Sequence, residues 1–72
     1  MIFKEGAEID TIVQNGNNYN FTTKTPINLV INSIVLFTNK EESQSSVYGQ
    51  IIEVNDNVYT TSANIMGYTN VI

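Results

Sequence analysis

The stretch Glu8-Ile9-Asp10-Thr11-Ile12-Val13-Gln14-Asn15-Gly16-Asn17-Asn18-Tyr19-Asn20-Phe21-Thr22-Thr23 carries the strongest local structural signal in the sequence. On both sides of Asn15-Gly16, β-branched and aromatic residues alternate with other residues, and a period of two is typical of a half-buried strand. The dipeptide Asn-Gly accepts the positive φ angles of a tight hairpin turn at low cost. The stretch therefore predicts a β-hairpin that turns at Asn15-Gly16.

After this hairpin, Thr25-Pro26 interrupts the pattern, because proline has no N–H to donate to a strand ladder. A long strand is expected over Ile27–Phe37. Both of its faces become apolar near Ile34, which indicates a change from half-buried to fully buried or a bulge around Asn32-Ser33. The polar residues Thr38–Ser46 follow, and they predict a surface loop.

The C-terminal part also favours short strands. Val47–Val54 and Val58–Thr61 are expected to pair through a turn at Asn55-Asp56-Asn57, since Asn and Asp tolerate left-handed conformations. If the pairing is centred on Asp56, Tyr59 lies opposite Glu53. Ser62–Met66 could form a single helical turn capped by Ser62, with Tyr68–Ile72 as a last strand.

Composition supports strands over helices throughout the chain. Ile, Val and Thr account for 25 of the 72 residues, and these β-branched types suit a pleated surface. No window shows sustained helical spacing of apolar residues. We expect an all-β fold in one domain over residues 1–72: a small antiparallel barrel of five to six strands with at most one short helical turn near the C-terminus.

The stretch Val47-Tyr48-Gly49-Gln50-Ile51-Ile52-Glu53-Val54, followed by a turn and Val58-Tyr59-Thr60, resembles the central hairpin of SH3-like barrels. The resemblance covers roughly residues 34–72 and implies the fold only. The chain has no tryptophan and lacks the usual acidic loop of peptide-binding SH3 domains. Recognition of proline-rich ligands is therefore not implied, and SH3-like barrels serve many unrelated functions.

The small size raises the question of what supports the fold. A 72-residue chain has a small core, and folds of this size often add disulfides, metals or a partner subunit. The chain has no cysteine and no histidine, which removes disulfides and the commonest zinc ligands. Self-association or docking into a larger assembly is the expected support, and a compact monomer is the alternative.

Charge narrows the classes of partner. The net charge is −4 with a pI near 4.3, and the three cations are all lysines. Binding to a phosphate backbone needs several clustered cations, so no nucleic-acid partner is expected, and anionic membranes are disfavoured for the same reason. Met1–Glu5 shows no signal-peptide pattern, and the apolar run Ile34–Phe37 is too short to span a membrane. We expect a cytoplasmic protein, or one within a particle assembled in the cytoplasm.

Candidate catalytic and metal-binding groups have simpler explanations. Ser43, Ser45 and Ser46 lie near Lys40 in a polar loop, where nothing lowers the basicity of the lysine. The acidic groups Glu5/Glu8/Asp10, Glu41/Glu42 and Glu53/Asp56 fall in turns or on exposed strand positions. Asn55-Asp56-Asn57 with Glu53 lacks the spacing and glycine of a calcium loop. The sequence predicts no enzyme, no metal site and no cofactor.

Tyrosine is enriched in protein interfaces, because it joins a large apolar area to a polar tip. The candidate interface residues are Tyr48, Tyr59, Tyr68, Val71 and Ile72, although packing in the core is the alternative for most of the rings. The leading hypothesis is a non-enzymatic assembly or interaction module that docks through strand edges and aromatic contacts. The abundance of Asn, Ile and Tyr, which have AT-rich codons, is consistent with an AT-rich bacterial, phage or mobile-element genome. The expected role is that of a structural or accessory component of a phage or mobile element.

Two alternatives remain from the sequence. One is a small acidic inhibitor that binds and blocks or sequesters a host factor, as an anti-defence protein would. The other is a pocket for a small metabolite, although the absence of arginine disfavours phosphorylated ligands.

Overall fold

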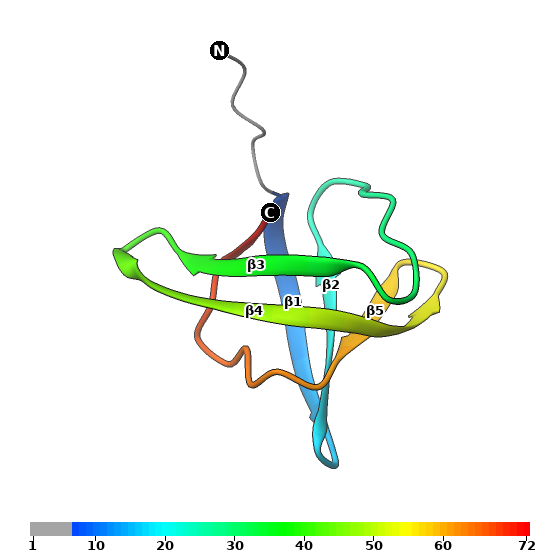
Figure 1. Ribbon diagram of the computed structural model, residues 1–72. Helices are drawn as coiled ribbons and strands as arrows, with labels where there is room; N and C mark the ends of the chain where they lie inside the picture. The colour runs from blue at the N-terminus through cyan, green and yellow to red at the C-terminus, as the bar shows by residue number, and fades with distance from the viewer. Residues whose placement is uncertain (1–6) are drawn as a thin grey trace.

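The computed structural model describes residues 7–72, with the side chains of residues 42–44 left aside. The strands are β1 (Ala7–Asn15), β2 (Asn18–Thr23), β3 (Ile34–Asn39), β4 (Glu42–Asn55), β5 (Val58–Thr61) and β6 (Asn70–Val71). They form a closed antiparallel barrel in the order β1-β2-β5-β4-β3-β6. Figure 1 shows β3 and β4 crossing in front of β1 and β2. No helix occurs within residues 7–72, so the predicted all-β barrel of SH3-like size is confirmed.

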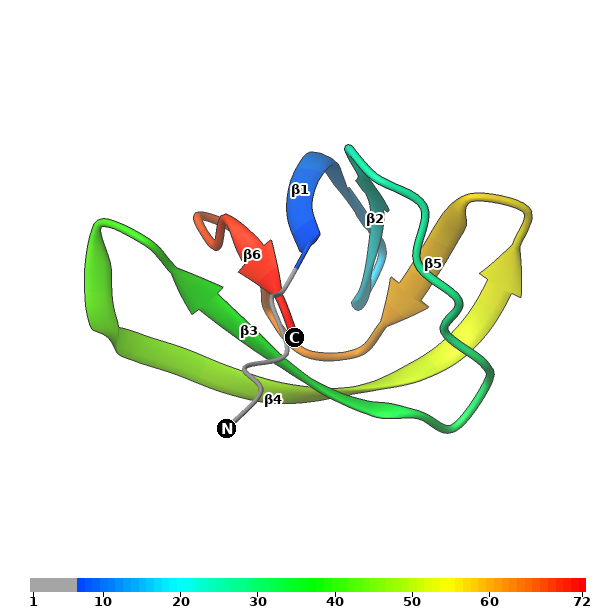
Figure 2. The same ribbon diagram turned by 90° about the horizontal axis from the view of Figure 1, so that it is seen from above.

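The barrel is made of two sheets that share β1 and β4. β1 pairs with β6 at Ala7 and Glu8, and with β2 along the rest of its length. β4 pairs with β3 up to Gln50, and with β5 from Ile51 onward. The register shifts between Ile9 and Thr11 in β1, and between Ile51 and Glu53 in β4. These bulges bend each strand from one sheet into the other, as seen from above in Figure 2.

The predicted β1–β2 hairpin is confirmed. Asn15 pairs with Asn18, and Gly16 in the two-residue loop has a φ of 64°. The simple alternation expected along β1 is wrong, however, because the bulge at Asp10 reverses the faces. Ile9 and Ile12 both pack against the core, and Val13 is 59% exposed.

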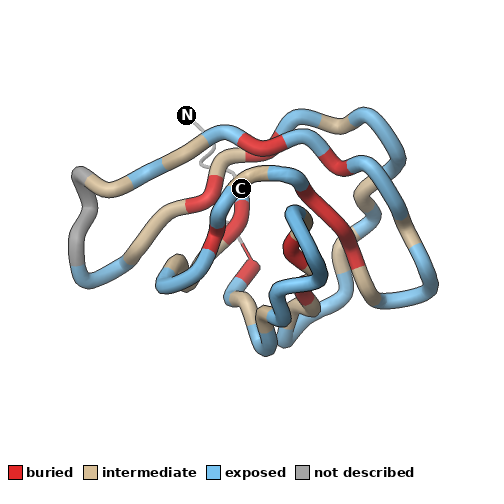
Figure 3. Tube along the Cα trace, turned by 90° about the horizontal axis from the view of Figure 1, so that it is seen from below, coloured by how far each residue is buried: buried red, intermediate tan, exposed pale blue. Residues whose placement is uncertain are grey.

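The core lies between the two sheets and is shown as the buried segments in Figure 3. The rings of Phe21 and Phe37 meet edge to face, with centroids 5.3 Å apart. Phe21 also packs against Tyr59 at 5.6 Å. The remaining buried apolar residues are Ala7, Tyr19, Val35, Ile51, Ile65 and Val71. This aromatic contact therefore joins the β1–β2–β5 sheet to the β3–β4–β6 sheet.

The long strand expected over Ile27–Phe37 is wrong in its first half. β3 begins at Ile34, and the chain turns just before it. Asn32 has a φ of 77°, and the N–H of Ser33 donates to the carbonyl of Val30 at 3.1 Å. Asparagine accepts this left-handed conformation more readily than most residues, so Asn32-Ser33 was the sign of a turn rather than of a bulge within a strand.

The surface loop expected over Thr38–Ser46 is also wrong. β3 continues to Asn39, Lys40 and Glu41 form the turn, and β4 begins at Glu42. The Glu41 N–H donates to the side-chain oxygen of Asn39 at 2.9 Å and stabilises this turn. Polar residues form strands here because this end of the hairpin extends beyond the core, and Thr38, Asn39 and Ser46 are half-buried or exposed.

Three C-terminal expectations need correction. Tyr59 lies opposite Val54 rather than Glu53, since the β4–β5 loop consists of Asp56 and Asn57 alone. Residues 62–66 form bends and a turn in place of a helical turn. The last strand is shorter than Tyr68–Ile72, although Ile72 still exchanges two backbone hydrogen bonds with Leu36.

Gly16 provides a test of the first hairpin. A Cβ at this position meets nothing within 4 Å, so the cost of substitution comes from the positive φ alone. We expect Gly16→Val to lower the free energy of unfolding by about 1 kcal/mol or more, because a β-branched residue resists this conformation. Gly16→Asn is the control and should cost much less. Equal stability of the two variants in urea denaturation would contradict the turn geometry.

Gly49 provides a test of the packing between the sheets. A Cβ here would lie 2.7 Å from Cε2 of Phe37 and 2.8 Å from Oγ1 of Thr61, both of which are buried. We expect Gly49→Ala to destabilise the protein by about 1–3 kcal/mol, because a Cβ at these distances forces the buried side chains of Phe37 and Thr61 to shift. Ser46→Ala, at an exposed position of the same strand, should have little effect. An unchanged Gly49→Ala midpoint in urea would show that the core is looser than described.

Candidate docking surface

Two of the five predicted interface residues lie in the core. Tyr59 is 5% exposed, and its hydroxyl donates to the backbone carbonyl of Ile27. Val71 is 2% exposed and pairs with both Ala7 and Phe37. Both side chains hold the barrel together, so neither presents a surface to another protein in this structure.

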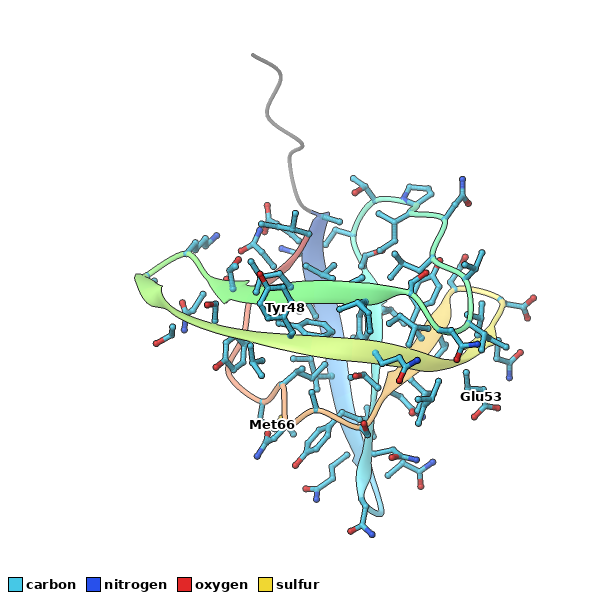
Figure 4. The ribbon with its side chains drawn as sticks, viewed as in Figure 1. Tyr48, Glu53 and Met66 are labelled. Atoms are coloured by element: carbon cyan, nitrogen blue, oxygen red, sulfur yellow. The ribbon has the colours of Figure 1, made fainter. Side chains whose placement is uncertain are left out.

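The other three residues differ in exposure. Tyr48 is 71% exposed and Ile72 is 44% exposed, whereas Tyr68 is half-buried against the core. Figure 4 shows Tyr48 in front of β3 and β4, on the side away from β1 and β2. The five predicted residues therefore do not form one surface, and Tyr48 and Ile72 are those that remain available.

Tyr48 and Ile72 are linked by Leu36, which sequence reasoning did not select. Tyr48 of β4 lies opposite Leu36 of β3, and Leu36 exchanges backbone hydrogen bonds of 3.1 and 2.8 Å with Ile72. Residues directly opposite each other in antiparallel strands place their side chains on the same face. The three side chains thus form a row across the sheet, and Ile34, two residues from Leu36, extends it. We call these four residues the outer apolar face.

Local alternation explains why this face is apolar. Within Ile34-Val35-Leu36-Phe37, Val35 and Phe37 point into the core, so Ile34 and Leu36 point outward. The run of four apolar residues indicates a strand buried on both faces, and full burial was one of the two expectations for this segment. The structure leaves the outer side uncovered instead, with Ile34 64% exposed.

Other exposed apolar residues gather near this face. Within residues 7–72, six of the eight large exposed hydrophobic residues lie on β3, on β4, in the turn before β3 or at the C-terminal residue: Val30, Ile31, Ile34, Tyr48, Ile52 and Ile72. The other two are Val13 in β1 and Met66, which Figure 4 shows on the segment that passes below β4. A concentration of exposed apolar residues on one side of a small domain is typical of an interaction surface.

One edge of β4 beside this face lacks a neighbouring strand. From Ser46 to Gln50, β4 pairs in register with β3, and β5 begins to occupy its other edge only at Ile51. Before Ser46 the register shifts, since Thr38 pairs with Ser46 and the next residue, Asn39, pairs with Glu42. Thr38 and Leu36 direct backbone groups toward β6, where they bond Thr69 and Ile72. Their partners Ser46 and Tyr48 are therefore at non-hydrogen-bonded positions of the β3–β4 ladder.

It follows that the N–H and C=O groups of Ser46 and Tyr48 point away from β3, toward the unoccupied edge. Neither residue has another cross-strand partner among residues 7–72. We call this segment, Ser46–Tyr48, the open edge of β4.

The open edge is free of charge. No acidic or basic residue occurs from Ser43 to Ile52, although the chain as a whole has a net charge of −4. Natural proteins often protect exposed edges with lysine, proline or a bulge, which discourage pairing with another strand. Ser46–Tyr48 contains no lysine or proline, and the one register irregularity between β3 and β4 lies just before it, between the pairs Thr38–Ser46 and Asn39–Glu42.

Charged groups and hollows lie elsewhere. Oε2 of Glu8 accepts a hydrogen bond from Nζ of Lys24 at 3.3 Å and forms an ion pair with Nζ of Lys40 at 3.9 Å, all at exposed positions. Within the described residues, no group of three acidic side chains is arranged to hold a metal ion. A polar hollow of about 360 Å³ is lined by Asp10, Thr22, Thr23, Lys24, Pro26, Ile27, Asn57 and Tyr59. The hydroxyl of Tyr59 already donates its proton to the backbone carbonyl of Ile27. A ligand in this hollow would therefore find its polar partners among the other lining residues.

Comparison of the chain with protein families, with curated proteins and with solved structures finds no match. Among residues 7–72, no helix has the length and apolar character needed to cross a membrane.

The open edge can be tested by amide hydrogen exchange in dilute protein. Val47 and Gly49 donate into the β3 ladder, whereas Ser46 and Tyr48 point to solvent. We expect the amides of Ser46 and Tyr48 to exchange much faster than those of Val47 and Gly49, because only the latter need the strand to open. Equal protection of all four amides in a dilute monomer would contradict the open edge.

Proposed function

We propose that this protein is a non-enzymatic interaction module that binds another protein chain through the open edge of β4 and the outer apolar face. The observation that carries this proposal is the coincidence of the two features at Tyr48. Its backbone groups point to an unpaired edge, and its side chain, 71% exposed, belongs to the outer apolar face.

Each feature supplies a different part of recognition. A strand added to a sheet edge gains main-chain hydrogen bonds, which give affinity with little dependence on sequence. Alternate side chains of the added strand then contact the face beside that edge, and these contacts give specificity. In this protein the contacting side chains would meet Tyr48 first and then Leu36, its neighbour across the ladder.

The barrel supports the exposed edge with a rigid frame. β4 is the longest strand, with 14 residues, and it belongs to both sheets. Gly49, between the open edge and the bulge, packs against Phe37 and Thr61 in the core. A frame of this kind loses little conformational freedom on binding, which favours affinity.

The proposed role is that of a structural or accessory component of a larger assembly, for example a phage particle assembled in the cytoplasm. Support for this role comes from the small size of the domain, the absence of cysteine and histidine, and the uncovered apolar face. A domain with little stability of its own gains from any partner that binds its folded state.

Selection of binders from a library of random extended peptides, with the protein immobilised, tests the docking proposal. We expect selected peptides to shift the NMR amide signals of Ser46, Tyr48 and Leu36. Ser46→Pro should weaken their binding by about tenfold or more, because proline removes an outward N–H and obstructs the edge. The ladder to β3 should survive, since Ser46 donates nothing to it.

Val13→Ser is the matched control for this experiment. Val13 is a large apolar residue, 59% exposed like those of the outer apolar face, but it lies near the tip of the β1–β2 hairpin. The variant should bind selected peptides as the wild-type protein does. If the selected peptides instead shift signals around Val13, or if Ser46→Pro leaves their binding unchanged, the proposed docking surface is wrong.

A further inference from the structure

We propose that the polar hollow beside the bulge in β1 binds a guanidinium group, such as that of arginine. The hollow has a volume of about 360 Å³, which is near the lower end of the roughly 300–1,000 Å³ typical of small-ligand sites. None of its lining residues belongs to the open edge of β4 or to the outer apolar face. The hollow is therefore a second binding site, and it does not depend on the proposed docking surface.

Three segments far apart in the sequence form the walls of the hollow: the bulge in β1, the end of β2 with Pro26 and Ile27 beyond it, and the β4–β5 turn. Hydrogen bonds hold these walls in place. The hydroxyl of Thr23 donates to the carbonyl of Thr25 at 2.6 Å, and that of Tyr59 donates to the carbonyl of Ile27. Proline fixes its own φ angle and restricts the segment further. Walls held in this way need little rearrangement when a ligand binds, which favours affinity.

The bulge in β1 supplies the carboxylate of the hollow. At this point the β1–β2 register advances by two residues in β1 and by one in β2, so Asp10 is the extra residue. A bulge redirects a side chain, and bulges are common beside functional sites. Asp10 lines the hollow, and its side chain has no hydrogen-bond or ion-pair partner in the described part of the chain.

Lys24 also lines the hollow, but its charge is already matched. Its Nζ lies 3.3 Å from Oε2 of Glu8, which is not a lining residue. Among the described residues, no ion pair joins Lys24 to Asp10. The carboxylate of Asp10 is thus the uncompensated charge of the hollow, in a chain whose net charge is −4. These charges favour a cationic ligand over an anionic one.

A guanidinium suits the remaining polar groups better than an ammonium. It is planar, it can donate two parallel hydrogen bonds to one carboxylate, and it is weakly hydrated. The hollow offers acceptors for its other N–H groups in the hydroxyl oxygens of Thr22 and Thr23 and in the side-chain oxygen of Asn57. The Asn57 side chain has no partner among the described residues. The methylene stem of an arginine can lie along Pro26 and Ile27.

Titration with N-acetyl-arginine amide, followed by NMR, tests this site. The compound carries one guanidinium and no other charge. We expect the amide signals of Asp10, Asn57 and Thr22 to shift, with a dissociation constant on the order of 1 mM for a ligand of this size. N-acetyl-citrulline amide is the matched ligand, because it replaces the guanidinium by a neutral group of the same shape. It should bind about tenfold more weakly or not detectably.

Two variants that each remove one carboxylate locate the site. Asp10→Asn should weaken binding of the arginine compound by about tenfold or more, because a neutral amide replaces the carboxylate. Asp56→Asn is the control, since Asp56 does not line the hollow and its loss changes the net charge equally. Asparagine also accepts the φ of 55° at this position. Both positions are exposed, so both variants should fold, and Asp56→Asn should change binding little.

Equal binding of the arginine and citrulline compounds, or equal effects of the two variants, would overturn the guanidinium site. So would the absence of shifts at up to roughly 20 mM ligand, or shifts centred on Glu53 and Asp56, which would show general attraction of a cation. A capped pentapeptide with one arginine between two pairs of glycines distinguishes the sources. If it binds as tightly as the single residue, the ligand is an arginine of a partner protein, whereas weaker binding assigns the hollow to a free guanidinium compound. Peptide binding at Ser46 tests the docking surface separately.

Discussion

The edge-to-face contact between Phe21 and Phe37 is the interaction on which the rest of the structure depends. It is the place where the two sheets of the barrel meet, with ring centroids 5.3 Å apart and both side chains fully buried. Phe37 also determines which residues of β3 face the core, because side chains alternate between the two faces of a strand. With Phe37 inside, Leu36 and Ile34 can only lie on the outer face. The outer apolar face is therefore a consequence of how the core is packed.

Gly49 extends this dependence to β4. The close approach of Phe37 and Thr61 leaves no room for a Cβ, so β4 can pass over the ring only with glycine at this position. Tyr48 and Gln50, on either side, then face outward. In this way one buried ring sets the direction of side chains on two strands, and it places Tyr48 opposite Leu36.

The sequence predicted the elements of the barrel better than their boundaries. The Asn15-Gly16 turn and the β4–β5 hairpin followed from local turn chemistry, which acts within a few residues. The bulge at Asp10 and the turn at Asn32 were missed or misplaced, because both are needed to close the barrel and closure depends on distant strands. Thr38–Ser46 was assigned to a loop on polarity alone, although polar residues can pair where a hairpin extends past the core.

The candidate site was predicted only in part, for the same physical reason. Residue type alone could not distinguish Tyr59 from Tyr48, because both are tyrosines. Tyr59 packs in the core, whereas Tyr48 is exposed. Position in the pleat decides between them, and that position depends on the bulge between Ile51 and Glu53. Leu36 and Ile34 were hidden in a run that also fits a strand buried on both faces. The uncharged stretch Ser43–Ile52 gave no signal, because residues 11–23, 25–39 and 57–72 are also uncharged.

The open edge has a cost for a small domain, and that cost bears on why it exists. Hydrogen-bonding groups left on an exposed edge contribute nothing to the stability of the monomer, and an uncharged edge invites unwanted pairing. A lysine at Ser46 or at Tyr48 would remove this hazard without disturbing the β3 ladder, since both positions face outward. A protein that had only to stay monomeric would be better served by such a residue. The uncharged edge is consistent with a chain whose β4 has a strand to bind, and the single tyrosine that links edge to face is where that strand would be recognised.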